Sequence, residues 1–80
     1  LMSFENVICN ANKSASGLVD AKGWWWQPAP SGSGTGTSCV FSNCHGRDCQ
    51  IGFDLFGLEY SVMNGCAADN IDGQAYRFIA

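Results

Sequence analysis

Three consecutive tryptophans, Trp24, Trp25 and Trp26, carry the clearest recognition chemistry in this sequence of 80 residues. If the stretch is extended, successive side chains point to opposite faces, so at least one indole must point away from any single core. An indole combines a flat apolar face with an N–H donor. Sugars, with apolar C–H faces and many hydroxyls, match that chemistry. The alternative interpretation is that two rings belong to the core and the third shields a loop.

Polar side chains near the triplet complete the predicted ligand site. Asp20, Lys22 and Gln27 lie on or beside the same segment, and Asn12 lies in the loop that precedes it. A later acidic loop and Arg77 could form a second edge. This set is compatible with sugar binding, although it is not a diagnostic motif.

A second group of reactive side chains combines three cysteines with the only histidine. Cys39, Cys44 and Cys49 are five residues apart, and His45 follows Cys44. Structural zinc sites usually bring their ligands in close pairs about two to four residues apart, and this spacing is absent here. Neighbouring side chains also diverge, so Cys44 and His45 do not form a nucleophile with its base. We therefore predict neither a metal site nor a catalytic cysteine.

The carboxylates do not predict catalysis either. Glycoside hydrolysis needs two acids across a sugar-sized cleft. Asp54 and Glu59 are candidate acids, but so small a domain can scarcely form a deep cleft. Residues 69–73 lack the spacing of a calcium loop and indicate a turn held by Asx hydrogen bonds. The glycines of residues 32–36 are not followed by the lysine of a phosphate-binding loop. The sequence thus predicts no enzyme and no cofactor.

Composition and charge narrow the class of protein. The chain is 46% hydrophobic and 14% charged, which is typical of a folded domain, and we expect one domain over residues 1–80. Its net charge is −3 and its four basic residues are scattered, so nucleic acid is not expected as a partner. No apolar run approaches the roughly 20 residues of a transmembrane helix. The chain has no signal peptide and starts at Leu1, which suggests a processed product or a fragment.

Five cysteines in so short a chain predict disulfides. Small secreted domains with limited cores are commonly stapled in this way, and two bridges would contribute about 2–4 kcal/mol each. We therefore expect an extracellular protein. The odd cysteine would stay reduced or would join a second chain, giving a dimer or a larger assembly. The pairing itself stays open among the possible arrangements.

The apolar pattern predicts a mixed fold. Residues 49–64 show a helical stripe, capped by Asp48 and ended by Gly65, at Ile51, Leu55, Leu58 and Val62. The competing interpretation is a pair of strands, residues 51–55 and 58–62, hinged at Gly57. Residues 18–27 predict a hairpin or one bent strand, and further strands are expected at residues 38–42 and 74–79. Residues 28–37 predict a flexible Pro/Gly/Ser-rich loop.

After a helix tail at the N-terminus, these elements predict an α+β sandwich of two layers. A small antiparallel sheet would carry one or two helices on one face, stapled by disulfides, with a small all-β barrel as the alternative. Two segments, residues 4–19 and 58–79, also share an order of features: apolar stretch, cysteine, Asn/Asp-rich loop, glycine, strand. This order suggests a degenerate internal duplication, but its period is too loose to prove one.

The first third of the chain also carries a resemblance. A cysteine, an asparagine-rich loop and a glycine-led strand ending in the tryptophans occur at Cys9, residues 10–16 and residues 17–26. This pattern, in a small acidic chain, resembles small secreted cysteine-rich fungal proteins, which include killer-toxin-like α+β sandwiches, host-directed effectors and small mushroom lectins. The chain departs from them in its odd cysteine number and its start near a helix tail, and no functional residue is carried over.

We therefore predict a secreted, lectin-like module that binds carbohydrate through Trp24–Trp26, with a glycan or a host cell-surface molecule as its partner. The alternative is a secreted toxin or effector subunit that acts through a protein or membrane partner. The odd cysteine and the processed-looking N-terminus favour that alternative, because both fit one chain of a larger assembly.

Overall fold

The computed structural model describes residues 2–17, 19–27 and 36–79, the side chains of residues 36, 37 and 59 excepted. Strands make up most of this part of the chain, and the one helix is a single turn. In chain order the elements are β1 (Met2–Glu5), β2 (Ile8–Asn10), α1 (Lys13–Ser16), β3 (Lys22–Trp26), β4 (Gly36–Thr37), β5 (Cys39–Ser42), β6 (His45–Phe56), β7 (Leu58–Glu59), β8 (Val62–Asn64) and β9 (Ala67–Ile79).

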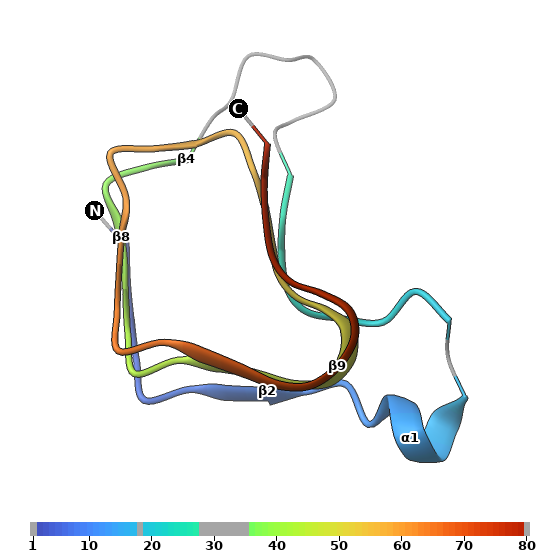
Figure 1. Cartoon of the computed structure of the whole chain (residues 1–80). Coiled ribbons are helices and arrows are strands. Elements are labelled where there is room, and N and C mark those ends of the chain that lie inside the picture. The colour runs from blue at the N-terminus through green and yellow to red at the C-terminus, as the bar shows by residue number, and fades with distance from the viewer. Residues whose placement is uncertain (1, 18, 28–35, 80) are drawn as a thin grey trace.

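The strands stack as three coils of a parallel solenoid. β1, β5 and β8 form one sheet, β2 and β3 pair with β6, which also pairs with β9, and β4 pairs with β7. All of these pairings are parallel. Figure 1 shows the chain going round the same circuit repeatedly, with strands of successive circuits on top of one another. We call β1–β3 the first coil, β4–β6 the second coil and β7–β9 the third coil.

The register repeats at nearly constant spacing between the second and third coils. Arg47 and Asp69 are partners 22 residues apart. The register shifts between Cys49 and Ile51, and beyond it the partners Asp54 and Arg77 are 23 residues apart. Because side chains alternate across a strand, constant register stacks inward residues on inward residues and outward on outward. Side chains at matching positions of successive coils therefore stack in columns that run along the solenoid.

One corner of the solenoid is set by left-handed backbone. Asn6, Asn43 and Gly65 follow directly after β1, β5 and β8, with φ of 57°, 53° and 68°. The N–H of Asn6 donates to Ser42 O and the N–H of Asn43 to Asn64 O, each at 2.9 Å. Asparagine and glycine tolerate this conformation better than other residues. Their positions therefore fix where each coil turns.

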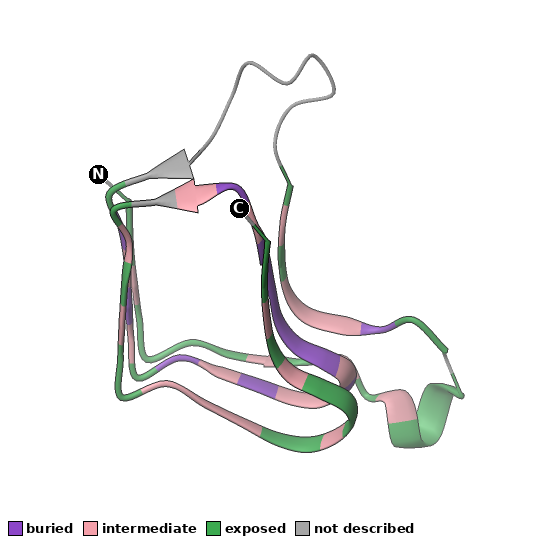
Figure 2. Ribbon diagram, turned by 45° about the horizontal axis from the view of Figure 1, so that its top comes forward, coloured by how far each residue is buried: buried purple, intermediate pink, exposed green. Residues whose placement is uncertain are grey.

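The core is a set of inward columns centred on the second coil. The cluster at its centre consists of the buried apolar side chains Cys39, Phe41, Cys44, Phe53 and Leu55. Figure 2 shows buried residues concentrated in the second coil, with exposed residues along much of the first and third. This distribution follows from the stack, because only the middle coil has a neighbour on both sides.

Aromatic rings make the two main columns. Phe53 is stacked between Trp24, at 5.7 Å between ring centroids, and Tyr76, at 5.4 Å, with interplanar angles of 6° and 11°. Phe4 stacks on Phe41 at 5.3 Å. Stacked rings of this kind stabilise by about 0.5–1.5 kcal/mol beyond the area that they bury.

The predicted α+β sandwich is wrong, because the sheets are parallel and the strands wind as coils. The all-β barrel, its alternative, also differs from these stacked parallel coils. The N-terminal helix tail is wrong as well, since residues 2–5 form β1. Residues 38–42 and 74–79 do contain strand, in β5 and β9. Of the predicted loop, residues 28–35 lie outside the described residues and residues 36–37 form β4.

The predicted helix over residues 49–64 is also wrong. These residues form most of β6, all of β7 and all of β8. Ile51, Phe53 and Leu55 alternate at strand period inside β6, and the turn at Gly57, with φ of 76°, then resets the phase of the alternation. That reset mimics a helical stripe. The competing interpretation, two strands hinged at Gly57, agrees with the element types.

The predicted disulfides are not found, since no disulfide joins any cysteines among the described residues. The thiols pack inside the coils instead. Cys44 Sγ donates to Phe4 O and Cys66 Sγ to Phe41 O, both at 3.3 Å. Cysteine here behaves as a small apolar residue that fits a narrow interior. The predictions of secretion and of a cystine-linked second chain lose the argument on which they rested.

Candidate functional site

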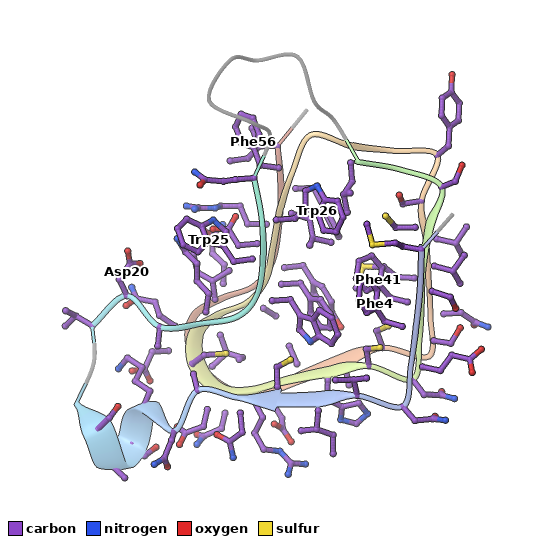
Figure 3. The ribbon with its side chains drawn as sticks, turned by 180° about the vertical axis from the view of Figure 1, so that it is seen from behind. Phe4, Asp20, Trp25, Trp26, Phe41 and Phe56 are labelled. Carbon is purple, nitrogen blue, oxygen red and sulfur yellow. The ribbon has the colours of Figure 1, made fainter. Side chains whose placement is uncertain are left out.

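β3 divides the tryptophan triplet between the two faces of the coil. Trp24 and Trp26 are half-buried and pack against the core, whereas Trp25 is 61% exposed. Figure 3 shows Trp26 pointing to the enclosed side, as Phe4 and Phe41 do, with Trp25 on the opposite side of the strand. Trp24 also donates from Nε1 to His45 O at 3.0 Å. Only one of the three indoles is therefore available to a ligand.

Trp25 heads an outward column that crosses all three coils. Its register partner in the second coil is Asp54, whose partner in the third coil is Arg77. We call these residues, together with Lys22, the Trp25 column. Lys22 Nζ lies 4.3 Å from the centre of the Trp25 ring and 3.4 Å from Asp54 Oδ2. A cation in this position is attracted by the ring face.

Asp54 is the anchor of the column. Its side chain is only 3% exposed. Arg77 donates to it through both nitrogens of a fork: Nε to Oδ1 at 2.9 Å and Nη2 to Oδ2 at 2.6 Å. A carboxylate so placed needs such partners, because an unpaired buried charge is costly. Asp54 thereby holds two cations in fixed positions beside an exposed indole.

The same contacts set the protonation of the column. Hydrogen bonds from Arg77 hold the pKa of Asp54 below its ordinary value, against burial, which acts in the opposite direction; Lys22 adds to the lowering. The hydrogen bond to Asp54 also raises the pKa of Arg77, and the charge of Asp20 contributes to that effect. Asp54 and Arg77 are therefore both charged at neutral pH.

The remaining predicted site residues divide between this face and another corner. Gln27 is exposed and follows Trp26 at the end of β3. Asp20 precedes β3 and is exposed, within electrostatic reach of Arg77. Asn12 instead caps α1 with φ of 57°, and its N–H bonds to Asn10 Oδ1 at 2.8 Å. Asn12 thus shapes the turn that leads from β2 into α1.

Sequence reasoning did not identify Asp54 as part of the site and gave Arg77 only as a possible second edge. The available signal was a lone carboxylate, Asp54, within the apolar residues 51–56. A buried acid in a strand demands a basic partner. Arg77 lies one coil further on in the same column. The spacing between coils, had it been known, would therefore have predicted Arg77 as the partner of Asp54.

α1 is fastened to the side of the second and third coils by a polar cluster. Asp48 accepts from Ser14 N at 3.1 Å, from Ser14 Oγ at 2.5 Å and from Asn70 Nδ2 at 3.1 Å. Lys13 forms an ion pair with Asp72. These groups satisfy one another, so the cluster explains how the insertion between β2 and β3 is held.

The thiols and the metal-ligating side chains form no further site. Burial raises the pKa of the Cys9 and Cys49 thiols, which keeps them protonated. Among the described residues, no three histidine, cysteine or acidic side chains come together as metal ligands.

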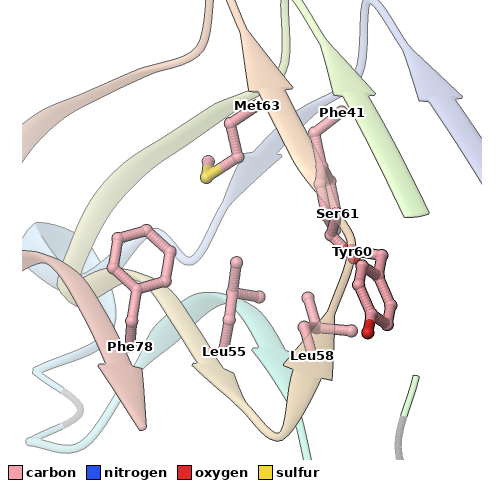
Figure 4. Close-up of a pocket in the computed structure, with 7 residues that line it drawn as sticks. All are labelled: Phe41, Leu55, Leu58, Tyr60, Ser61, Met63 and Phe78. Atoms are coloured by element: carbon pink, nitrogen blue, oxygen red, sulfur yellow. The ribbon is translucent and has the colours of Figure 1, made fainter. Parts of the chain in front are cut away.

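An apolar hollow of about 440 Å³ opens beside the third coil. Figure 4 shows its lining, which comes from the second and third coils and consists of Phe41, Leu55, Leu58, Tyr60, Ser61, Met63 and Phe78. Phe78 remains 64% exposed and Tyr60 87% exposed at its rim. The hollow is the end of the solenoid interior, where no further coil covers the inward side chains among the described residues.

Comparisons with known proteins give no match: no family model, no curated protein and no solved structure is significantly similar to the chain. Within the described residues, no helix has the length and apolar character needed to cross a membrane.

Proposed function

We propose that the chain binds carbohydrate through the Trp25 column. The observation that carries the proposal is the position of Trp25: a 61% exposed indole on an outer face, beside two cations that a buried carboxylate holds in place. An exposed indole with polar groups fixed beside it combines an apolar stacking face with hydrogen-bond donors. Here its neighbours are those that a sugar site requires.

The ligand class follows from the chemistry of the column. The indole face stacks on the C–H face of a sugar ring, and its Nε1–H is a donor for a hydroxyl. Lys22 and Arg77 keep further donors for hydroxyl oxygens, since Arg77 is still 38% exposed while it binds Asp54. Two cations beside Asp54 and Asp20 leave little net charge. We therefore expect neutral sugars rather than acidic ones.

Binding without hydrolysis is the expected chemistry. Asp54 is held ionised by Arg77 and Lys22, so it is a poor proton donor, and both of its oxygens are occupied by these cations. An outer face that is not enclosed also gives each sugar few contacts. We expect weak binding per site and a preference for extended oligosaccharides, which can contact more of the face.

The test is a glycan array followed by titration of any ligand found. Trp25→Ala should weaken binding about tenfold or more, which corresponds to about 1.4 kcal/mol. Tyr60→Ala is the matched control, because Tyr60 is an exposed aromatic residue of the third coil outside the Trp25 column. It should bind as the unaltered chain does.

Tryptophan fluorescence gives an independent readout, since a sugar on Trp25 should change its emission. A blank array together with unchanged fluorescence would refute carbohydrate binding. A ligand bound equally well by Trp25→Ala would refute the assignment of the site.

A further inference from the structure

Both ends of the solenoid present strand edges and inward apolar side chains without a covering coil. In the described part of the chain, β1, β2 and β3 pair only with the second coil, and β8 and β9 also pair only with it. Such edges are templates for pairing with another chain. Solenoid ends normally need a polar capping element. Neither end has one among the described residues.

The apolar side chains at the two ends occupy the same columns. The inward column of Phe41 begins at Phe4 and ends at Met63. The column of Phe53 begins at Trp24 and ends at Tyr76.

A third inward column shows the same arrangement. Leu55 lies between Trp26, in the first coil, and Phe78, in the third. Phe78 is 64% exposed although it is aligned with a core residue. Met2 is likewise 48% exposed above the buried Cys39. These exposures mark interior positions that a further coil would cover.

We propose that a second copy of this chain covers the third coil with its own first coil, in a head-to-tail stack. The columns then continue across the junction: Met63, Tyr76 and Phe78 of one copy meet Phe4, Trp24 and Trp26 of the next. The apolar hollow beside Phe78 receives the aromatic side chains of that first coil. The parallel strand order, β5 to β8, continues into β1 of the second copy.

The polar and aromatic pairs of the continued register are compatible with this occupant. In the continued register, Arg77 of one copy meets Trp25 of the next, which is a cation–π pair. Asp69 meets Asn10, and Asn64 meets Glu5. Outside the Trp25 column, where Lys22 also lies over the indole, no like charges face each other in these register pairs. An arbitrary partner would have no reason to match them.

The insertion that contains α1 is drawn toward the second and third coils by its polar contacts. Lys13 pairs with Asp72 and Ser14 bonds to Asp48, so the insertion folds beside the second and third coils. It therefore leaves the edge of the first coil uncovered. A head-to-tail contact does not close on itself, so copies add one after another.

Two single variants test the arrangement, and each blocks one end. Met2→Lys places a charge on the first coil, and Phe78→Lys places one on the third. Both positions are already substantially exposed, at 48% and 64%, so the fold should tolerate the change. Val19→Lys makes a similar change at a residue that is 79% exposed in the insertion between α1 and β3, outside the strands, and serves as the control.

Sedimentation velocity over a range of concentrations is the measurement. The unaltered chain and Val19→Lys should show an average mass that rises steadily above 8.6 kDa with concentration. Each end variant alone should stay at 8.6 kDa. A mixture of the two end variants should form a 1:1 pair, because each retains the end that the other has lost.

Other results would overturn the proposal. An unaltered chain that stays monomeric at every concentration would exclude self-stacking. The uncovered coils would then have to bind a different partner. Dimers formed by Met2→Lys alone, but not by Phe78→Lys, would show a symmetric contact between two third coils instead. A mixture that fails to pair would exclude the head-to-tail contact, provided that circular dichroism shows both variants folded. Because neither variant alters the Trp25 column, failure of this test leaves carbohydrate binding untouched.

Discussion

Replacing Phe53 by alanine tests the column arrangement on which every other inference depends. Phe53 is fully buried and stacked between Trp24 and Tyr76. Truncation of a core phenylalanine to alanine costs about 3–5 kcal/mol of unfolding free energy. Tyr76 is 39% exposed and has room to relax, which places the expected cost near the lower end, at about 3 kcal/mol.

That loss is large for so small a domain. Stabilities of about 0.05–0.15 kcal/mol per residue correspond to roughly 4–12 kcal/mol for the whole chain. A change of 1 kcal/mol moves the melting temperature by about 4–8 °C at this size, so Phe53→Ala should lower it by roughly 12–24 °C. Urea unfolding followed by circular dichroism gives the free energy directly, and the slope against urea should not change.

Phe56→Ala supplies the matched control within the same strand. Phe56 is at an outward position of β6 and is only partly buried. Its truncation should cost less than about 1 kcal/mol, because the side chain leaves no cavity in the core. Equal costs at the two positions, or a larger cost at Phe56, would refute the assignment of inward and outward faces.

Two further predictions concern acid and thiols. The lowered pKa of Asp54 means that its stabilising contribution is complete above its unfolded pKa of about 3.9 and is lost as the pH falls through the lower folded value. Asp54→Asn should abolish this part of the acid dependence; parallel acid unfolding curves of the two proteins would contradict it. Separately, a reducing agent should leave the unfolding midpoint unchanged, because no disulfide joins the described cysteines. The thiols of the folded chain should react slowly with a thiol reagent. Fast labelling of the folded chain would contradict this and show that the thiols are accessible.

The local geometry of the tryptophan segment could be predicted from the sequence. Strand alternation alone placed Trp24 and Trp26 on one face and Trp25 on the other, and β3 has this arrangement. The polar neighbours Lys22 and Asp20 were also identified. What local reasoning does not provide is the identity of the strands beside β3, and therefore the anchor Asp54.

The coil repeat could not be recognised because its residues change from coil to coil. Phe4-Glu5-Asn6 recurs as Phe41-Ser42-Asn43, but the third coil has Met63-Asn64-Gly65 at the same corner. The insertion between Asn10 and Lys22 further alters the spacing between the first two coils. Comparing only the first and last segments therefore missed the middle coil, which carries most of the core.

The cysteines show how a compositional argument fails without a fold. Five thiols in a short chain suggest staples when the core is assumed to be too small. A parallel solenoid solves the same problem differently, because each coil covers the one before it and buries narrow inward columns. Cys44 is fully buried inside this structure, and Cys66 Sγ donates to Phe41 O of the neighbouring coil. Small side chains at these positions let the coils approach closely.

The proposed site and the proposed assembly follow from one property of the fold, the repetition of columns along the stack. Neighbouring parallel strands lie about 4.8 Å apart, so three coils rise by roughly 14 Å. A head-to-tail stack would therefore repeat Trp25 at about that interval along one outer face. Single indoles bind sugars weakly, but a row of them engages an extended polysaccharide at several points, and the linked sites gain affinity without any new contact. Under both proposals, the exposed ends and the exposed tryptophan would have one common physical explanation, in which assembly would convert a weak site into a strong one.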